Sequence, residues 1–123
     1  MVEQVIIAGF GGQGVMSMGQ LLAYSGMLEN KNVSWLPSYG PEMRGGTANC
    51  NVIISDEAIG SPIVTEATTV IAMNLPSLDR FEQAVKPGGL LFINSSLIER
   101  KSGRTDINVF YVPANEIADE LGN

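Results

Sequence analysis

Two glycine-rich stretches of this 123-residue sequence contain residue types that bind anions. The first fits the pattern G-x-G-x-x-G and directly follows the apolar run Val5–Ala8. Glycines in such a turn let the backbone approach a ligand, and the unpaired N–H groups that open a following helix attract negative charge. This stretch predicts a loop that binds a phosphate or a carboxylate, formed by Gly9, Gly11, Gly12, Gln13 and Gly14. The alternative is that its glycines only allow close strand–helix packing and subunit contact.

The second stretch, PSYGPEMRGGTAN at residues 37–49, places one arginine among two prolines and three glycines. Arg44 is the only basic residue between Lys31 and Arg80. A guanidinium group binds a carboxylate or a phosphate through two parallel hydrogen bonds, so Arg44 is the expected working charge of this loop. The alternative is an internal ion pair with Glu42 that only holds the loop in shape.

The composition argues against several kinds of catalytic and metal site. The sequence has no histidine and a single cysteine, Cys50. The missing histidine removes the usual general base and the commonest metal ligand. One thiol holds neither an iron–sulfur cluster nor a cysteine-type zinc site. We therefore expect no catalytic residue and no metal site in this chain, and we interpret Cys50 as a small core residue.

Charge and hydropathy argue against two classes of partner. Thirteen acidic and seven basic residues give a formal net charge of −6, and no basic stripe is present. A nucleic-acid partner is therefore not expected. No apolar run approaches the ~20 residues that cross a membrane, and no secretion signal precedes the first strand. The expected location is the cytoplasm.

Apolar runs alternate with amphipathic segments along the whole chain. They predict strands at Val5–Ala8, Val33–Leu36, Thr47–Ser55, Thr69–Met73, Leu90–Asn94 and Asn108–Val112, and helices over residues 12–30, over residues 74–85 and from residue 113 onward. The connection between the second and third strands is too short for a parallel crossover, so these two strands should be antiparallel. The expected fold is an α/β, three-layer Rossmann-like domain with a mixed, mostly parallel sheet.

Two finer expectations concern side-chain burial. In the first helix, the predicted buried face consists of Val15, Met18, Leu22 and Leu28, widened by Met16, Leu21 and Met27. The charged segment 98–106 is predicted to be a solvated loop. The last helix begins at Pro113 with apolar positions Ala114, Ile117, Ala118 and Leu121 and then breaks off. We therefore expect one domain over residues 1–123 whose C-terminal part is missing.

The two glycine-rich stretches, with Ile59-Gly60-Ser61-Pro62, resemble the gamma subunit of the 2-oxoacid:ferredoxin oxidoreductases. The most specific block is Ser38-Tyr39-Gly40-Pro41-Glu42-Met43-Arg44-Gly45-Gly46. The family includes enzymes for pyruvate, 2-oxoisovalerate, 2-oxoglutarate and indolepyruvate. The resemblance covers essentially the whole chain, although gamma subunits of the family are longer.

The resemblance implies a complex that converts a 2-oxoacid and coenzyme A to acyl-CoA, CO2 and reduced ferredoxin. Thiamine diphosphate, magnesium and iron–sulfur clusters would belong to the alpha, beta and delta partners, and this chain would bind none of them alone. It would be a non-catalytic companion that self-associates when isolated. The loop that faces the partner subunits or coenzyme A would consist of Tyr39, Gly40, Pro41, Glu42, Arg44, Gly45 and Gly46.

Two other functions are compatible with parts of the sequence. One is a stand-alone nucleotide-binding oxidoreductase of Rossmann type. In such a domain an acidic residue usually ends the second strand and binds the ribose, whereas Leu36, Pro37 and Ser38 stand there. The other is a purely structural module whose glycines serve packing alone.

Overall fold

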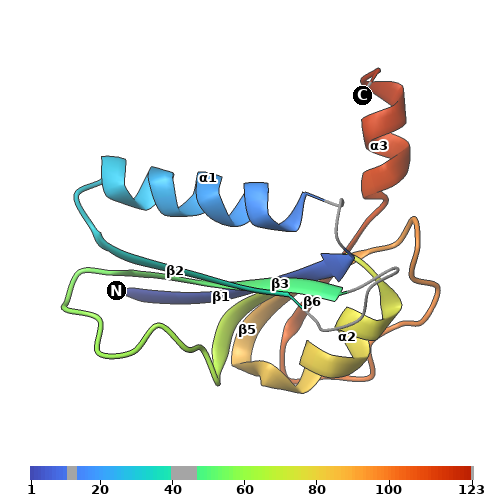
Figure 1. The fold of residues 1–123 in the computed structure, drawn as a ribbon. Helices are drawn as coiled ribbons and strands as arrows, with labels where there is room; N and C mark the ends of the chain where they lie inside the picture. Colours follow the sequence, from blue (N-terminus) through green and yellow to red (C-terminus); the bar gives the residue numbers. More distant parts are fainter. Residues whose placement is uncertain (11–13, 40–46, 123) are drawn as a thin grey trace.

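The computed structural model describes residues 1–10, 14–39 and 47–122. These residues form one six-stranded sheet with helices on both faces (Figure 1). The strands are β1 (Val2–Phe10), β2 (Asn32–Tyr39), β3 (Thr47–Ser55), β4 (Ala67–Ala72), β5 (Val85–Asn94) and β6 (Asn108–Val112). The helices are α1 (Val15–Leu28), α2 (Leu75–Phe81) and α3 (Ala114–Glu120), and the short 3-10 helix η1 (Glu82–Ala84) follows α2.

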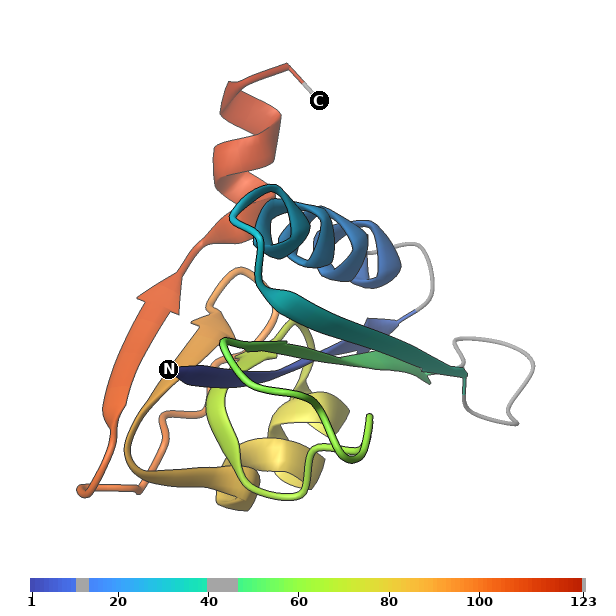
Figure 2. The ribbon, with the colours of Figure 1, turned by 90° about the vertical axis from the view of Figure 1, so that its left-hand side faces the viewer.

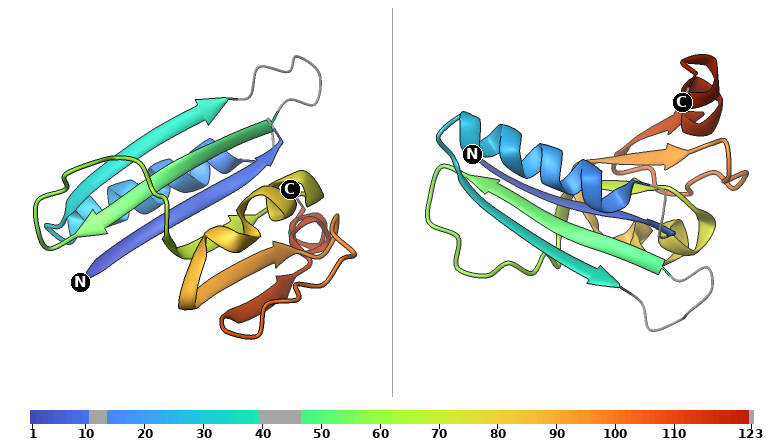
Figure 3. Two further views of the ribbon diagram at one scale, coloured as in Figure 1. Left: turned by 90° about the horizontal axis from the view of Figure 1, so that it is seen from below. Right: turned by 45° about the horizontal axis from the view of Figure 1, so that its top comes forward.

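The order of the strands across the sheet is β2-β3-β1-β4-β5-β6. Strand β3 is antiparallel to both of its neighbours, β2 and β1, whereas β1, β4, β5 and β6 pair in parallel. The mixed, mostly parallel sheet and the antiparallel second and third strands are therefore confirmed. Because β3 lies between them, β1 and β2 run in the same direction and end at the same edge of the sheet (Figure 3).

The sheet separates two apolar cores. Helix α1 packs on one face against β1, β2 and β3, and α2 packs on the other face against β4 and β1 (Figure 2). Residues of β1 contribute to both cores, with Ile6 on the α2 side and Val5 and Ile7 on the α1 side. The prediction of a first strand buried on both faces is thus confirmed, as expected for an inner strand of an α/β sheet.

The predicted buried face of α1 is confirmed only in part. Val15 is buried, and Met16, Met18 and Leu22 pack against the core on this side of the sheet. Leu21, Met27 and Leu28 are each more than 60% exposed. The other buried positions of the helix are small residues that the apolar spacing does not indicate: Gly19, Ala23 and Gly26. A Cβ atom at Gly19 would lie 2.4 Å from Cys50 Sγ and 2.8 Å from Trp35 Nε1, so the glycine lets α1 approach the sheet more closely than a side chain allows.

Cys50 lies at the centre of this close contact. It is fully buried, as predicted for a core residue, and its thiol donates a hydrogen bond to the Val15 carbonyl at 3.6 Å. Burial raises the pKa of the Cys50 thiol, although its contact with Trp35 acts in the opposite direction. The thiol is therefore protonated at neutral pH and acts as a small apolar side chain.

The segment between β5 and β6 is more ordered than the predicted solvated loop. Ile98 is buried, and the largely buried carboxylate of Glu82 accepts hydrogen bonds from Ser102 Oγ at 2.6 Å and from Arg100 at 3.0 Å. Arg104 donates to the carbonyl oxygens of Glu82 and Val85. The charges of the segment thus tie it to η1, a role that charge composition alone does not indicate.

Helices α2 and α3 agree with the predictions only in part. Helix α2 begins as expected, because the Asn74 side chain accepts a hydrogen bond from the Ser77 N–H at 2.9 Å and Pro76 occupies the first turn. The helix ends at Phe81, however, and Val85, which was expected on its buried face, is the first residue of β5. In α3 none of the residues with the predicted apolar spacing is buried.

Substituting Gly19 by valine should lower the free energy of unfolding by about 2–3 kcal/mol, because the new side chain overpacks the contact with Cys50 and Trp35. Gln20→Val, at the exposed neighbouring position of α1, is the control for the helix propensity of valine. Urea unfolding of both variants measures the difference. Equal stability of the two variants would show that α1 does not need a glycine here.

The hydrogen bonds to Glu82 predict a pH dependence of stability. Burial opposes ionisation of this carboxyl, but the hydrogen bonds from Ser102 and Arg100 outweigh it, so its folded-state pKa lies below the ordinary value. The carboxylate therefore stabilises the fold above its unfolded-state pKa, and this contribution is lost as the pH falls through the folded-state pKa.

Glu82→Gln should lower the unfolding free energy at pH 7 by about 1.5–3 kcal/mol, the usual loss of a hydrogen bond to a charged group. The variant should also lose less stability than the unmodified chain as the pH falls below about 5. Glu99→Gln, at an exposed position, is the control. Parallel pH profiles for the unmodified chain and Glu82→Gln would contradict this assignment.

Candidate functional site

Strand β3 lies between the strands from which the two glycine-rich stretches continue, β1 and β2. Ala48 of β3 pairs with Gly9 of β1 on one side and with Tyr39 of β2 on the other. Phe10, at the end of β1, pairs with Thr47. Both stretches therefore leave the sheet at the same edge, beside the start of α1.

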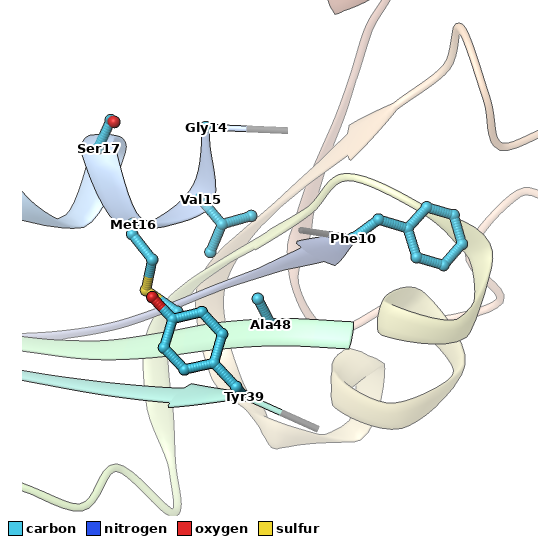
Figure 4. A pocket seen from close by; sticks show the side chains of 7 residues that line it. All are labelled: Phe10, Gly14, Val15, Met16, Ser17, Tyr39 and Ala48. Carbon is cyan, nitrogen blue, oxygen red and sulfur yellow. The ribbon is translucent and has the colours of Figure 1, made fainter. Parts of the chain in front are cut away.

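A pocket of about 350 Å³ lies at this edge, and we call it the carboxyl-edge pocket (Figure 4). Its lining comes from the end of β1, the start of α1, the end of β2 and the start of β3. The lining residues are Phe10, Gly14, Val15, Met16, Ser17, Tyr39 and Ala48. Tyr39 is 70% exposed, so its ring forms an accessible wall of the pocket.

The structure places three of the predicted site residues. Gly14 and Tyr39, which lie on different motifs, line the same pocket, whereas Gly9 lies within β1 and pairs with Ala48. The remaining predicted residues lie outside the described ranges: Gly11, Gly12, Gln13, Gly40, Pro41, Glu42, Arg44, Gly45 and Gly46.

Gly14 is the N-cap residue of α1 and has a φ of 79°, in the left-handed region. A Cβ atom there would contact nothing within 4 Å, so the backbone conformation, not lack of space, favours glycine. The first helical hydrogen bond runs from the Met18 N–H to the Gly14 carbonyl at 2.9 Å. The N–H groups that precede Met18 have no acceptor within the helix and give this end of α1 a partial positive charge.

The described part of the pocket suits binding better than catalysis. Its side-chain polar groups are the hydroxyls of Ser17 and Tyr39, and the start of α1 adds the partial positive charge of a helix N-terminus. Phe10, Met16 and Ala48 add apolar surface. This combination fits a ligand group that is anionic at one end and apolar or aromatic at the other.

The sequence motifs do not indicate several of these lining residues. Phe10 occupies an unspecified position of the G-x-G-x-x-G pattern, and the apolar spacing predicts Met16 on the buried face of the helix. Ser17, three positions after the helix cap, carries the one signal that could have been used, since short polar side chains often serve helix N-termini. Phe10 and Ala48 line the pocket only because of the β1–β3 pairing, which requires the fold.

Within residues 1–10, 14–39 and 47–122 no group of three or more histidine, cysteine, aspartate or glutamate side chains is arranged to hold a metal ion. In the same part of the chain no helix has both the length and the apolarity needed to span a bilayer.

The glycine-rich stretches and the fold around them match a known family. The family model described as pyruvate ferredoxin/flavodoxin oxidoreductase matches residues 4–123. The chain belongs to this family. The resemblance expected from its motifs is therefore confirmed at the level of the pyruvate ferredoxin/flavodoxin oxidoreductase family.

Curated relatives agree with this assignment. The chain is 46% identical over 119 residues to the ketoisovalerate oxidoreductase subunit VorA of Methanothermobacter marburgensis, covering 97% of this chain and 25% of the relative. It is 32% identical over 122 residues to the 2-oxoglutarate synthase subunit KorC of Methanocaldococcus jannaschii, covering 98% and 65%. The chain thus spans a quarter of the first relative and about two thirds of the second.

Solved structures share the fold of this oxidoreductase-family chain. The gamma subunit of a keto/oxoacid ferredoxin oxidoreductase from Geobacter sulfurreducens matches with a TM-score of 0.84 and 25% identity, covering 100% of this chain and 67% of the other. A 2-oxoglutarate:ferredoxin oxidoreductase from Magnetococcus marinus, solved with 2-oxoglutarate, coenzyme A and succinyl-CoA bound, matches with a TM-score of 0.88 and 20% identity, covering 99% and 22%. The latter likeness concerns the fold.

Gly14→Ala should lower the free energy of unfolding by about 1–2 kcal/mol, because alanine is strained at a φ of 79°. Gly14→Asn should retain most of the stability, since asparagine tolerates this conformation and also caps helices. Gly60→Ala is the control, because its Cβ meets open space at an ordinary φ. Thermal unfolding of the three variants gives the comparison, and equal stability of Gly14→Ala and Gly60→Ala would contradict the strained cap.

Proposed function

We propose that this chain is the gamma part of a 2-oxoacid:ferredoxin oxidoreductase. The whole enzyme converts a 2-oxoacid and coenzyme A to acyl-CoA and CO2 and reduces ferredoxin. The similarity to KorC and to the Geobacter sulfurreducens gamma subunit supports this proposal. The complex acts in the cytoplasm.

In this proposal the chemistry takes place on partner subunits. Thiamine diphosphate, magnesium and the iron–sulfur clusters are held by alpha, beta and delta subunits or domains, and this chain contacts them as a non-catalytic companion. Isolated from those partners and from the rest of its own polypeptide, the domain of residues 1–123 self-associates through apolar surface that is otherwise covered. The 2-oxoacid is selected by the partners, so the four known substrate classes of the family remain equal candidates.

The carboxyl-edge pocket is the proposed contact point with coenzyme A or with a partner subunit. The observation that supports this assignment is the pairing of Ala48 with both Gly9 and Tyr39, because the strand ends that precede the two motif loops lie at one edge. In the proposal Gly11, Gly12 and Gln13 complete the anion-binding turn next to Gly14. Arg44 binds a phosphate of coenzyme A or a carboxylate of the partner, and its flanking residues Gly40, Pro41, Glu42, Gly45 and Gly46 shape the loop that carries it.

A stand-alone nucleotide-binding oxidoreductase fits the topology less well. In dinucleotide-binding domains the second strand lies beside the first and presents an acidic residue to the ribose. Here β3 separates β2 from β1, and β2 ends with Tyr39. The place beside β1 where a dinucleotide-binding domain has its second strand, with the acidic residue for the ribose, is therefore taken by β3.

Replacing Arg44 by alanine in the assembled enzyme tests the proposed function. If Arg44 binds coenzyme A, its removal should raise the Michaelis constant for coenzyme A by about 10- to 100-fold, the loss of a hydrogen bond between charged groups. If it binds a partner carboxylate, the complex should dissociate at concentrations at which the unmodified enzyme stays assembled.

The control is Arg80→Ala, which removes an arginine that lies over the Phe81 ring on α2, away from the pocket. This variant should leave assembly and the Michaelis constant for coenzyme A unchanged. An Arg44→Ala enzyme with normal assembly, rate and coenzyme A dependence would contradict the proposed role and favour an internal pair with Glu42.

A further inference from the structure

Among the described residues, no helix packs on β5 and β6 on the sheet face that carries α1. Helix α1 covers β1, β2 and β3, while β4, β5 and β6 lie beside it on the same face. Parallel strands of α/β domains are normally covered on both faces. We call this region the open sheet face. It consists of Phe92, Phe110 and Val112, and Ile71 and Met73, which pack against the α1 core, form its border.

The open sheet face is apolar and forms a groove of about 290 Å³ against the flank of α1. No charged side chain is among the groove's described lining residues, which are Met18, Ile71, Met73, Phe92, Ile93, Asn94, Val112 and Ala114. The rings of Phe92 and Phe110 stack with centroids 5.2 Å apart, and Phe110 is 47% exposed. Contiguous apolar surface of this kind marks a contact with another apolar element.

Helix α3 borders the same groove with an apolar stripe of its own. Ala114, Ile117, Ala118 and Leu121 follow the i, i+3, i+4, i+7 spacing of one helix face, and Ala114 also lines the groove. Ile117 is 41% and Leu121 73% exposed. Figures 1 and 2 both show α3 rising from the end of β6 on the side of the sheet that carries α1. A helix placed between α1 and α3 would contact both the open sheet face and the apolar stripe of α3.

The lengths of the relatives indicate where such an element comes from. The match covers 98% of this chain but only 65% of KorC, and 100% of this chain but only 67% of the Geobacter sulfurreducens gamma subunit. About a third of each of these gamma-type relatives thus lies outside the matched region. Helices that cover parallel sheets are normally supplied by the same polypeptide, because they lie in or next to the crossover connections.

We propose that an amphipathic helix from the part of the gamma polypeptide that lies outside residues 1–123 packs on the open sheet face, between α1 and α3. Its apolar side contacts Phe92, Phe110 and Val112, and its outer side is polar. The inference rests on the bare face and on the lengths of the relatives, and is independent of any role of Arg44.

Thiol protection in the gamma subunit, as it is produced from its own gene, tests this proposal. Phe110→Cys places a thiol on the open sheet face, and Met27→Cys places one on the far flank of α1, where the side chain is 61% exposed. The alkylation rate by N-ethylmaleimide is measured for the isolated subunit in dilute solution. Cys50 is buried and reacts slowly in both variants.

At least tenfold slower alkylation at position 110 than at position 27, independent of protein concentration, is the expected result. Protection that rises with concentration would assign the face to a second copy, and protection that requires the partner subunits would assign it to them; either result overturns the proposal, as does no protection. Val112→Cys gives a second reporter if Phe110→Cys does not fold. The response to Arg44→Ala is unaffected by any of these outcomes.

Discussion

The pairing of β3 between β1 and β2 is the constraint on which the rest of this structure depends. The connection that carries Arg44 is too short to cross over the sheet, so β3 returns antiparallel and separates the first two strands. As a result β1 and β2 end at the same edge, with Gly9 and Tyr39 on either side of Ala48. Gly14 and Tyr39, which belong to two separate motifs, thereby line one pocket. The second strand no longer lies beside the first, as it does in a dinucleotide-binding domain.

The position of α1 over this edge depends on small residues. Gly19 and Gly26 allow the helix to lie directly on Cys50, Trp35 and Ile54, and Gly14 turns the chain into the helix with a positive φ. The start of α1 is thus held at the pocket by packing along its whole length. On the opposite face, Glu82, Arg100 and Arg104 hold the segment before β6 in place. Both faces thus have an apolar core, and on the α2 side polar contacts to Glu82 also hold the segment before β6.

Much of the architecture could be predicted from the sequence, because it depends on local patterns. The strands Thr47–Ser55 and Asn108–Val112 have the predicted bounds, and the antiparallel return follows from connection length. Only part of the buried face of α1 could be predicted in this way, since periodicity counts apolar residues such as Val15 whereas Gly19 is buried for its lack of a side chain. The order of segment 98–106 depends on partners such as Glu82 that are distant in the chain. For the pocket, the motifs identified Gly14 and Tyr39, but Phe10 and Ala48 become lining residues only through the β1–β3 register.

The carboxyl edge of β1 and β2 is the proposed contact face of the gamma part. Amide hydrogen exchange of the gamma subunit, alone and in the assembled oxidoreductase, tests it most directly. If this edge is the contact face, the peptides that span residues 9–17 and 38–48 should exchange at least tenfold more slowly on assembly or on addition of coenzyme A. Unchanged exchange in both peptides, with new protection confined to α2 or to the segment before β6, would contradict it.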